Sequence, residues 1–353
     1  MRFGLFTLLP RRDVSRSPGA VLEETLALAD VAEATPAFDS VWIAEHHFSN
    51  YGLVASPLPF AVKLAERTRR LRLATAVLVL PFYHPLRLAE EIALVDHLTG
   101  GRLTVGLGRG YQPYEFARFG LTLEQSRELF DEGLEVLVRA LSQPSFSFEG
   151  AHFRIPAASL ALPPLQRPHP PMVIAASSPE SLGQAARRGF AVVTTANWFP
   201  MEQILPVRRA YEEQLGRAGR GTHEADFSCM RFVYVTDSKA DMLEAAEQGL
   251  WICRVSGGFR DNRARVRDGQ VEMDQPPDEP SPELFAERMI FGDAETCIEK
   301  LERLRETLRP TRLLYNAQLG GLPPDRVRRS LERFAERVAP HFARAAVGAT
   351  PAS

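Results

Sequence analysis

Apolar, strand-like runs alternate with amphipathic, helix-like stretches along the whole chain of 353 residues. The expected strands are Arg2–Thr7, Ser40–Ala44, Arg72–Val79, Leu103–Gly108, Met172–Ala176, Ala191–Thr195, Phe227–Thr236 and Arg312–Tyr315. Between them apolar residues recur at helical spacing, and the expected helices are Leu22–Ala34, Leu86–Leu98, Ser126–Leu141, Ser181–Arg188, Pro200–Arg217, Lys239–Cys253, Ala294–Thr307 and Asp325–Phe342. Eight strands, each followed by a helix, predict an α/β fold, a (β/α)8 TIM barrel rather than an open sheet.

The chain is longer than the roughly 250 residues of a basic barrel, so we expect insertions at the C-terminal face. One is the proline-rich stretch 144–171, with a hairpin-like piece at Ser145–Ile155. The other, 254–282, is polar, and we expect either a lid or a tolerated surface loop. Residues 1–342 form a single expected domain, and 343–353 a flexible tail.

Composition excludes several classes of protein. The formal net charge is −2, so no basic surface indicates nucleic acid. The three cysteines, Cys229, Cys253 and Cys297, are too few and too scattered for a disulfide framework or a zinc site, which favours a cytoplasmic location. No signal peptide and no apolar run of about 18 residues is present, so we expect no membrane partner.

The segment Trp42–Phe48 changes from apolar to ionisable residues where a strand should end. Glu45, His46 and His47 follow one another there, and barrels keep their chemistry at such strand ends. A histidine can transfer protons near neutral pH, although a structural histidine at a strand end is the simpler interpretation. Successive residues of a strand point to opposite faces, so we expect no metal site from the two histidines.

Two further strand ends could hold an anion. Arg109 lies in the glycine-rich turn Gly106–Pro113, and Arg127 lies on the helix that follows. In Ala175–Ser181 the hydroxyls of Ser177 and Ser178 precede a helix, whose N-terminus favours negative charge. Simple helix capping, together with a solvated arginine, explains these residues about as well.

Several motifs together resemble the catalytic subunit of bacterial luciferase and its flavin-dependent monooxygenase relatives. The similarity is dense from Met1 to about Leu141 and thinner beyond. It rests on Phe3-Gly4, Phe38–Phe48, Leu78–Pro81 with His84-Pro85, Leu94–Leu103, and Arg109-Gly110 with Phe116–Gly120.

The resemblance implies a barrel that binds reduced FMN and uses O₂, through a C4a-hydroperoxyflavin, to oxygenate a substrate. It implies His46 as the catalytic histidine and Glu45 as the acidic partner beside it. The phosphate positions are Arg109, Arg127, Ser177 and about Ser181, and Ala76 and Val77 match the backbone below the flavin ring, often through a cis peptide. Gly108 stands where the luciferase subunit has a reactive cysteine, and Ala176 where it has an acidic residue, so we expect a non-luminous enzyme.

The expected function is therefore a two-component monooxygenase supplied by a separate NAD(P)H:flavin reductase. The expected substrate is a small, largely apolar organic molecule, held by Phe6, Tyr111, Trp198 and Phe259. Two alternatives are an F420-dependent oxidoreductase of the same fold and a non-catalytic flavin-binding protein. The helices Pro57–Thr68 and Leu86–Leu98 match those that pair in the family, so we expect a homodimer.

Overall fold

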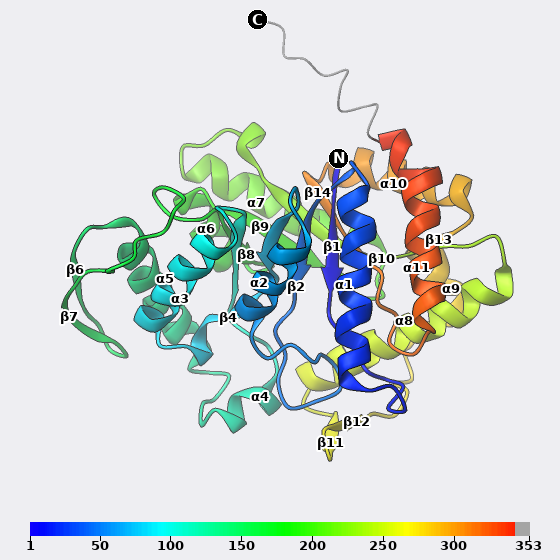
Figure 1. Ribbon diagram of the computed structural model, residues 1–353, viewed down its shortest axis with the longest axis horizontal. Helices are drawn as coiled ribbons and strands as arrows, with labels where there is room; N and C mark the ends of the chain where they lie inside the picture. The colour runs from blue at the N-terminus through cyan, green and yellow to red at the C-terminus, as the bar shows by residue number, and fades with distance from the viewer. Residues whose placement is uncertain (343–353) are drawn as a thin grey trace, which may run out of the picture.

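Eight parallel strands close into a barrel in the computed structural model, which describes residues 1–342 (Figure 1). The strands are β1 Arg2–Thr7, β2 Phe38–Ile43, β3 Arg72–Thr75 continued by β4 Leu78–Val79, β5 Leu103–Gly108, β8 Met172–Ala175, β9 Ala191–Thr195, β10 Phe227–Val235 and β14 Arg312–Asn316. Each pairs with its neighbour in this order, and β14 pairs with β1 to close the ring. The predicted TIM barrel is confirmed, and the tail 343–353 lies outside the described residues.

The expected third strand is interrupted. The segment Arg72–Val79 forms two strands because the chain leaves the β3 register at Ala76, and the peptide bond between Ala76 and Val77 is cis. The resemblance led us to expect such a bond at this position. The interruption lies at the C-terminal end of β3, on the rim where the other strands also end.

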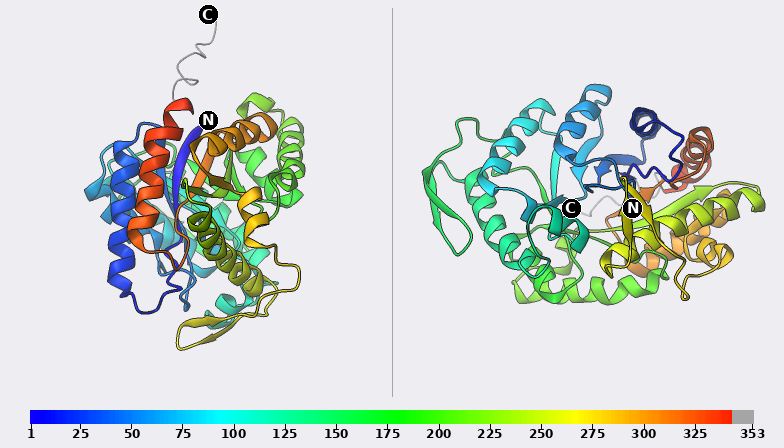
Figure 2. Two further views of the ribbon diagram at one scale, coloured as in Figure 1. Left: turned by 90° about the vertical axis from the view of Figure 1, so that its right-hand side faces the viewer. Right: turned by 90° about the horizontal axis from the view of Figure 1, so that it is seen from below.

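Outer helices surround the barrel (Figure 2). They are α1 Pro18–Ala34, α2 Pro57–Arg67, α3 Pro85–Leu98, α5 Ser126–Ser142, α6 Pro179–Arg188, α7 Leu205–Arg217, α10 Ala294–Leu308 and α11 Pro324–Arg333, with a π-helical turn at Phe334–Val338. Local signals set their ends: Ser17 accepts a hydrogen bond from the backbone of Ala20 and precedes a proline. Gly189 ends α6 with a positive φ of 69°.

The seventh βα unit departs from the prediction. Helix α8 spans Lys239–Arg260, so the first residues of the expected 254–282 loop are helical. The outer helix of this unit is α10 instead, which follows α9 Pro282–Arg288 and the short strand β13 Ile290–Gly292. Gly257 and Gly258 look like a loop in the sequence, but Gly258 has a packing role, because a Cβ there would lie 2.7 Å from the sulfur of Met273.

The two insertions lie in different parts of the molecule. Within 144–171, the antiparallel strands β6 Phe146–Glu149 and β7 Arg154–Ala158 form the expected hairpin, and Glu132 of α5 accepts hydrogen bonds from three backbone amides of its turn. The second insertion carries the hairpin of β11 Arg265–Arg267 and β12 Gln270–Glu272, which lies at the same end as α4 Pro113–Arg118 (Figure 1).

A carboxylate ties the first two strands to the last. Asp39 of β2 receives two hydrogen bonds from Arg312 of β14, one to each carboxylate oxygen and both 2.8 Å long, across β1, and its Oδ2 also lies 3.3 Å from Nε of Arg2. Burial alone raises the pKa of Asp39, but the bonds from Arg312 outweigh it and hold the pKa below its ordinary value. This ion pair therefore stabilises the closure of the barrel.

We expect Asp39→Asn to lower the free energy of unfolding by about 1 to 3 kcal/mol at neutral pH. A carboxylate with a lowered pKa stabilises the fold above its ordinary pKa, and this stabilisation is lost as the pH falls through the lowered value. The difference between variant and parent in urea unfolding should therefore shrink in acid. Asp30→Asn is the control, because its bidentate pair with Arg67 is exposed and should contribute little. Equal losses for both variants would contradict the prediction.

Candidate functional site

A cavity of about 410 Å³ opens at the C-terminal ends of the strands. Eleven of the predicted site residues line it: Phe6, Glu45, His46, Ala76, Val77, Arg109, Tyr111, Arg127, Ser177, Ser178 and Ser181. Phe6 belongs to β1, and the others lie in the segments that follow β2, β3, β5 and β8, so the barrel brings residues of five strands together. The sequence did not single out the other side of the cavity, which Ile252, Cys253, Ser256 and Arg260 of α8 line.

Two of the predicted pocket residues lie outside this lining. Phe259 is 1% exposed and packs behind the wall, with its ring 6.0 Å from that of Tyr51 and 5.4 Å from that of Tyr114. Ser256 and Arg260 are one helical turn apart and share the face of α8 that meets the cavity, whereas Phe259 lies on another face. Trp198 is replaced in the lining by its neighbour Asn197. Aromatic character did not predict which way either side chain points.

One end of the cavity gathers cations and hydroxyls. Arg109 follows β5, and Arg127 lies in the first turn of α5, 3.9 Å from Glu180. Ser178 caps α6, where its hydroxyl oxygen accepts a bond from the amide of Ser181. Two arginines and a helix N-terminus thus meet at one place, an arrangement that favours an anion.

Strand β5 has no room for side chains at Gly106 and Gly108, beside the cis peptide bond between Ala76 and Val77. A Cβ on Gly108 would lie 2.4 Å from Cγ2 of Val77, and one on Gly106 would lie 2.0 Å from the carbonyl oxygen of Thr75. Both distances are far below van der Waals contact: the backbone of Thr75 leaves no room for a side chain at 106, and the side chain of Val77 leaves none at 108. The backbone of β5 can therefore lie close to a flat ligand placed over Ala76 and Val77.

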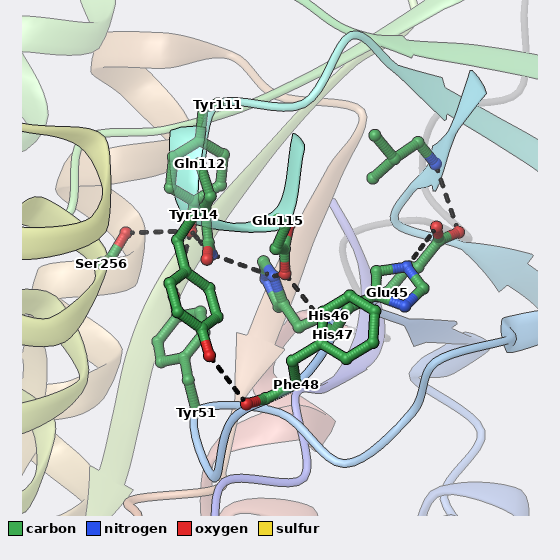
Figure 3. Close-up of polar contacts among 11 residues, drawn as sticks. Glu45, His46, His47, Phe48, Tyr51, Tyr111, Gln112, Tyr114, Glu115 and Ser256 are labelled. Carbon is green, nitrogen blue, oxygen red and sulfur yellow. Dashed lines mark hydrogen bonds and ion pairs between the residues drawn. The ribbon is translucent and has the colours of Figure 1, made fainter. Parts of the chain in front are cut away.

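His46 and His47 face opposite sides of the chain, and each has its own carboxylate (Figure 3). Nδ1 of His46 lies 3.1 Å from Oε1 of Glu115, whereas Nε2 of His47 lies 2.9 Å from Oε1 of Glu45. The structure therefore corrects the expected pairing of Glu45 with His46. In an extended chain, residues two apart share a face, which places Glu45 beside His47.

Glu45 is buried, with 2% exposure, and its second oxygen accepts bonds from the hydroxyl of Tyr83 and the backbone amide of Val79. Burial raises the pKa of this carboxyl despite those bonds and the nearby His47, and burial also raises the pKa of Tyr83. The ring of His47 packs edge-on against Phe82 and Phe119. This second pair is thus part of the packing between β2, β4 and α4.

A chain of polar contacts runs from His46 to α8. Nε2 of Gln112 lies 3.1 Å from Nδ1 of His46 and 3.2 Å from the hydroxyl of Tyr111. That hydroxyl in turn lies 3.3 Å from Oγ of Ser256 and 3.5 Å from the hydroxyl of Tyr51. Burial raises the pKa of both tyrosines, so their hydroxyls remain protonated. The sequence reasoning missed Gln112 and Glu115, because nothing in a six-residue helix and the residue before it shows which side chains turn inward.

The segment beyond α8 is tied to the rim. Asn50, four residues after His46, donates from its backbone amide to the carbonyl of Gly269, and its side chain accepts from the amide of Val271. Arg254 forms two hydrogen bonds with Glu279, whose side chain is fully buried. Some charged side chains of the polar segment 254–282 therefore form internal contacts rather than facing solvent.

Residues 1–342 contain no group of three or more side chains that could hold a metal ion. Over the same range no helix is both long and apolar enough to cross a membrane. The three cysteines are buried and free.

Several of the known proteins that this chain resembles are monooxygenases, and others share the fold. The sequence model of the luciferase-like monooxygenase family matches residues 1–310. The oxygenase component of the flavin-dependent trigonelline monooxygenase of Acinetobacter baylyi is 25% identical, over 98% of this chain and 97% of that protein. The solved structure of monooxygenase RslO1 from Streptomyces bottropensis is 27% identical, with a TM-score of 0.84 over 97% of this chain and 100% of that one. An F420-dependent secondary alcohol dehydrogenase, 19% identical, shares the fold, with a TM-score of 0.75 over 96% of this chain and 98% of that one.

The contact at Asn50 generates a prediction about the hairpin β11–β12. We expect Asn50→Ala to increase the rate of tryptic cleavage within 261–272, because one hydrogen bond from the rim to Val271 is lost. The melting temperature of the barrel should change little, since no strand is altered. Gln270→Ala, an exposed position on β12, is the control. Equal cleavage of the parent and Asn50→Ala would show that Asn50 does not hold the hairpin.

Proposed function

The chain belongs to the luciferase-like monooxygenase family, and we propose that it is the oxygenating component of a two-component system that uses reduced FMN and O₂. The observation that carries this proposal is that one cavity combines an end suited to an anion, at Arg109 and α6, with a proton-transfer group, His46, elsewhere in its lining. A bound reduced flavin supplies the electrons that activate O₂. The protein itself binds and orients the flavin and the substrate, and it keeps water out of the cavity.

The phosphate of FMN is a dianion, and the arginine end of the cavity suits it. Arg109 and Arg127 present forked donors, and the hydroxyls of Ser177, Ser178 and Ser181 surround the N-terminus of α6. With the phosphate there, the ring system would extend over Ala76 and Val77, where Gly106 and Gly108 leave the backbone bare. The residues present therefore fit the cofactor in charge and in shape.

The remaining lining suits an apolar substrate. Phe6, Leu8, Phe232 and Ile252 provide the apolar surface, and Tyr111 adds a hydroxyl. This composition supports a small, largely apolar organic molecule such as an aldehyde, a ketone or an aromatic compound. Helix α8 covers this side, and keeping water out limits loss of the activated oxygen as peroxide.

A separate reductase would supply the reduced flavin. The Acinetobacter relative carries the name of an oxygenase component, which supports a two-protein system. The glycine-rich turn Gly106–Pro113 lacks the spacing of a dinucleotide fingerprint, so it offers no nicotinamide site. The F420-dependent dehydrogenase shows that this fold also serves deazaflavin chemistry. A measurement of FMN and F420 binding distinguishes the two cofactors for this protein.

A homodimer is a further part of the proposal. Helix α3 exposes Leu94 and Leu98, and the nearby insertion exposes Leu162 and Leu165. The insertion is fixed beside α3 by the bond from His97 to the carbonyl of Pro163. An apolar patch of this kind typically marks an interface. We expect light scattering to give twice the monomer mass, and Leu94→Glu combined with Leu98→Glu to give monomers. A parent protein that is monomeric at all concentrations would contradict this.

Cofactor binding tests the proposal directly. We expect the protein to bind FMN far more tightly than NAD(P)H or F420. Arg109→Ala should weaken FMN binding by roughly 1.5 to 3 kcal/mol, because a charge-assisted bond to the phosphate is lost. Riboflavin, which lacks the phosphate, should bind parent and variant equally. Arg328→Ala, an exposed arginine on α11 that does not line the cavity, is the control. Fluorescence titration measures each affinity, and unchanged FMN affinity in Arg109→Ala would remove this residue from the site.

The second test concerns the proton acceptor. We expect His46→Ala to fold and bind FMN normally but to lose product formation by about 10²- to 10⁴-fold, the usual contribution of a general base. His47→Ala should chiefly lower the melting temperature, because it removes the buried partner of Glu45. Products from a panel of aldehydes, ketones and aromatic compounds are measured with reduced FMN supplied by a reductase. Parent-like activity of His46→Ala across the pH range would exclude it as the base.

A further inference from the structure

Glu115 is a buried carboxylate that the sequence did not connect with chemistry. It belongs to the short helix α4, is 2% exposed, and points toward the loop that follows β2 (Figure 3). One of its oxygens, Oε1, lies 2.8 Å from the backbone nitrogen of His47 and 3.1 Å from Nδ1 of His46. A single oxygen thus contacts two consecutive residues of the loop that carries the proposed base.

The backbone contact identifies Oε1 as an acceptor. An amide N–H can only donate, so Oε1 receives that hydrogen bond. A carboxylate accepts through both oxygens, and the ring nitrogen facing the same atom must therefore donate. In a neutral imidazole only one nitrogen carries a proton, so the contact with Glu115 places this proton on Nδ1 of His46.

The other ring nitrogen is left with its lone pair. Nε2 of His46 has no hydrogen-bond partner in the described part of the chain, nor is it among the buried atoms that lack a partner, so it is open to the cavity that His46 lines. The rings of Tyr51 and Tyr111 pack edge-on against the imidazole at 4.7 and 6.1 Å and limit its rotation.

The side chain of Gln112 also contacts Nδ1 of His46, the atom that carries this proton. Its amide nitrogen is placed 3.1 Å from Nδ1, while its amide oxygen, Oε1, is buried without a partner. The two ends of an amide are interchangeable in shape, and the orientation with the oxygen toward His46 lets it accept from Nδ1–H and from the hydroxyl of Tyr111. In that orientation both groups that face Nδ1 are acceptors.

We infer that Glu115 is a positioning residue whose carboxylate fixes His46 in the Nδ1–H tautomer and leaves Nε2 facing the cavity as the proton acceptor. When Nε2 takes a proton, the positive ring forms beside the carboxylate, which stabilises it. This inference rests on the proposed function of His46 as the base. The tautomer itself can be measured in the free protein without flavin or substrate.

A purely structural role is the competing explanation, because Glu115 also anchors the backbone of His47. Two variants distinguish the two roles. Glu115→Gln keeps an oxygen that can accept both hydrogen bonds but removes the charge. Glu115→Leu removes the acceptors altogether and retains an apolar side chain of similar size. Glu45→Gln is the matched control, because it removes the charge from the equivalent pair at His47.

Nitrogen-15 NMR of the histidine rings at about pH 9, where an ordinary imidazole is neutral, reports the tautomer. The His46 signals are assigned by their loss in His46→Gln. We expect the parent to carry the proton on Nδ1, with the proton signal shifted downfield by the charged acceptor. Glu115→Gln should move this signal upfield, and Glu115→Leu should transfer the proton largely to Nε2. Glu45→Gln should change the His47 signals and leave those of His46 in place.

Three results would overturn the inference: an Nε2–H tautomer in the parent, a parent-like Nδ1 proton signal in Glu115→Gln, or an unchanged tautomer in Glu115→Leu. If Glu115→Leu does not fold, the parent and Glu115→Gln still decide it. A protein that shows the expected tautomers but binds no FMN would refute the proposed function and leave the positioning role of Glu115 intact.

Discussion

Closure of the parallel sheet is the constraint on which the rest of the structure depends. The strands are parallel, so their C-terminal ends lie on one side, and because β1 is hydrogen-bonded to both β2 and β14 these ends form a closed rim. Arg109, Ser178 and His46 are far apart in the sequence, yet they line one cavity for this reason alone. The ion pair of Asp39 with Arg312 holds the same closure from the opposite end of the strands.

The sequence predicted the barrel well because its strands are buried on both faces. Such strands appear as short, continuous apolar runs, and β1, β5 and β9 have the bounds that were expected. Helix α8 was predicted too short, since a pair of glycines looks the same whether it ends a helix or admits a neighbouring side chain. At Gly258 that neighbour is Met273, which lies far enough along the chain to leave no local signal.

Residues of the candidate site could be predicted where the position of the backbone alone brings them to the cavity. They could not be predicted where the direction of the side chain determines whether they reach it. Residues at strand ends, such as His46 and Arg109, must lie near the rim. Phe259 and Glu115 lie on helices, where neighbouring positions face different ways, and their direction depends on packing between distant segments. The pairing of Glu45 with His47 was within reach, because residues two apart in an extended segment share a face.

The close approach of β4 to β5 makes two positions interdependent. Gly108 has no side chain because the methyl group of Val77 occupies the space that a Cβ would need. A larger residue at 108 is therefore compatible with the fold only when residue 77 becomes smaller, and the two should co-vary among related chains. The volume above the cis peptide is shared between these two positions. A smaller residue at 77 combined with a larger one at 108 would move this side-chain volume from one strand to the other. The change would reshape one side of the cavity and leave the end at Arg109 and Arg127 unaltered.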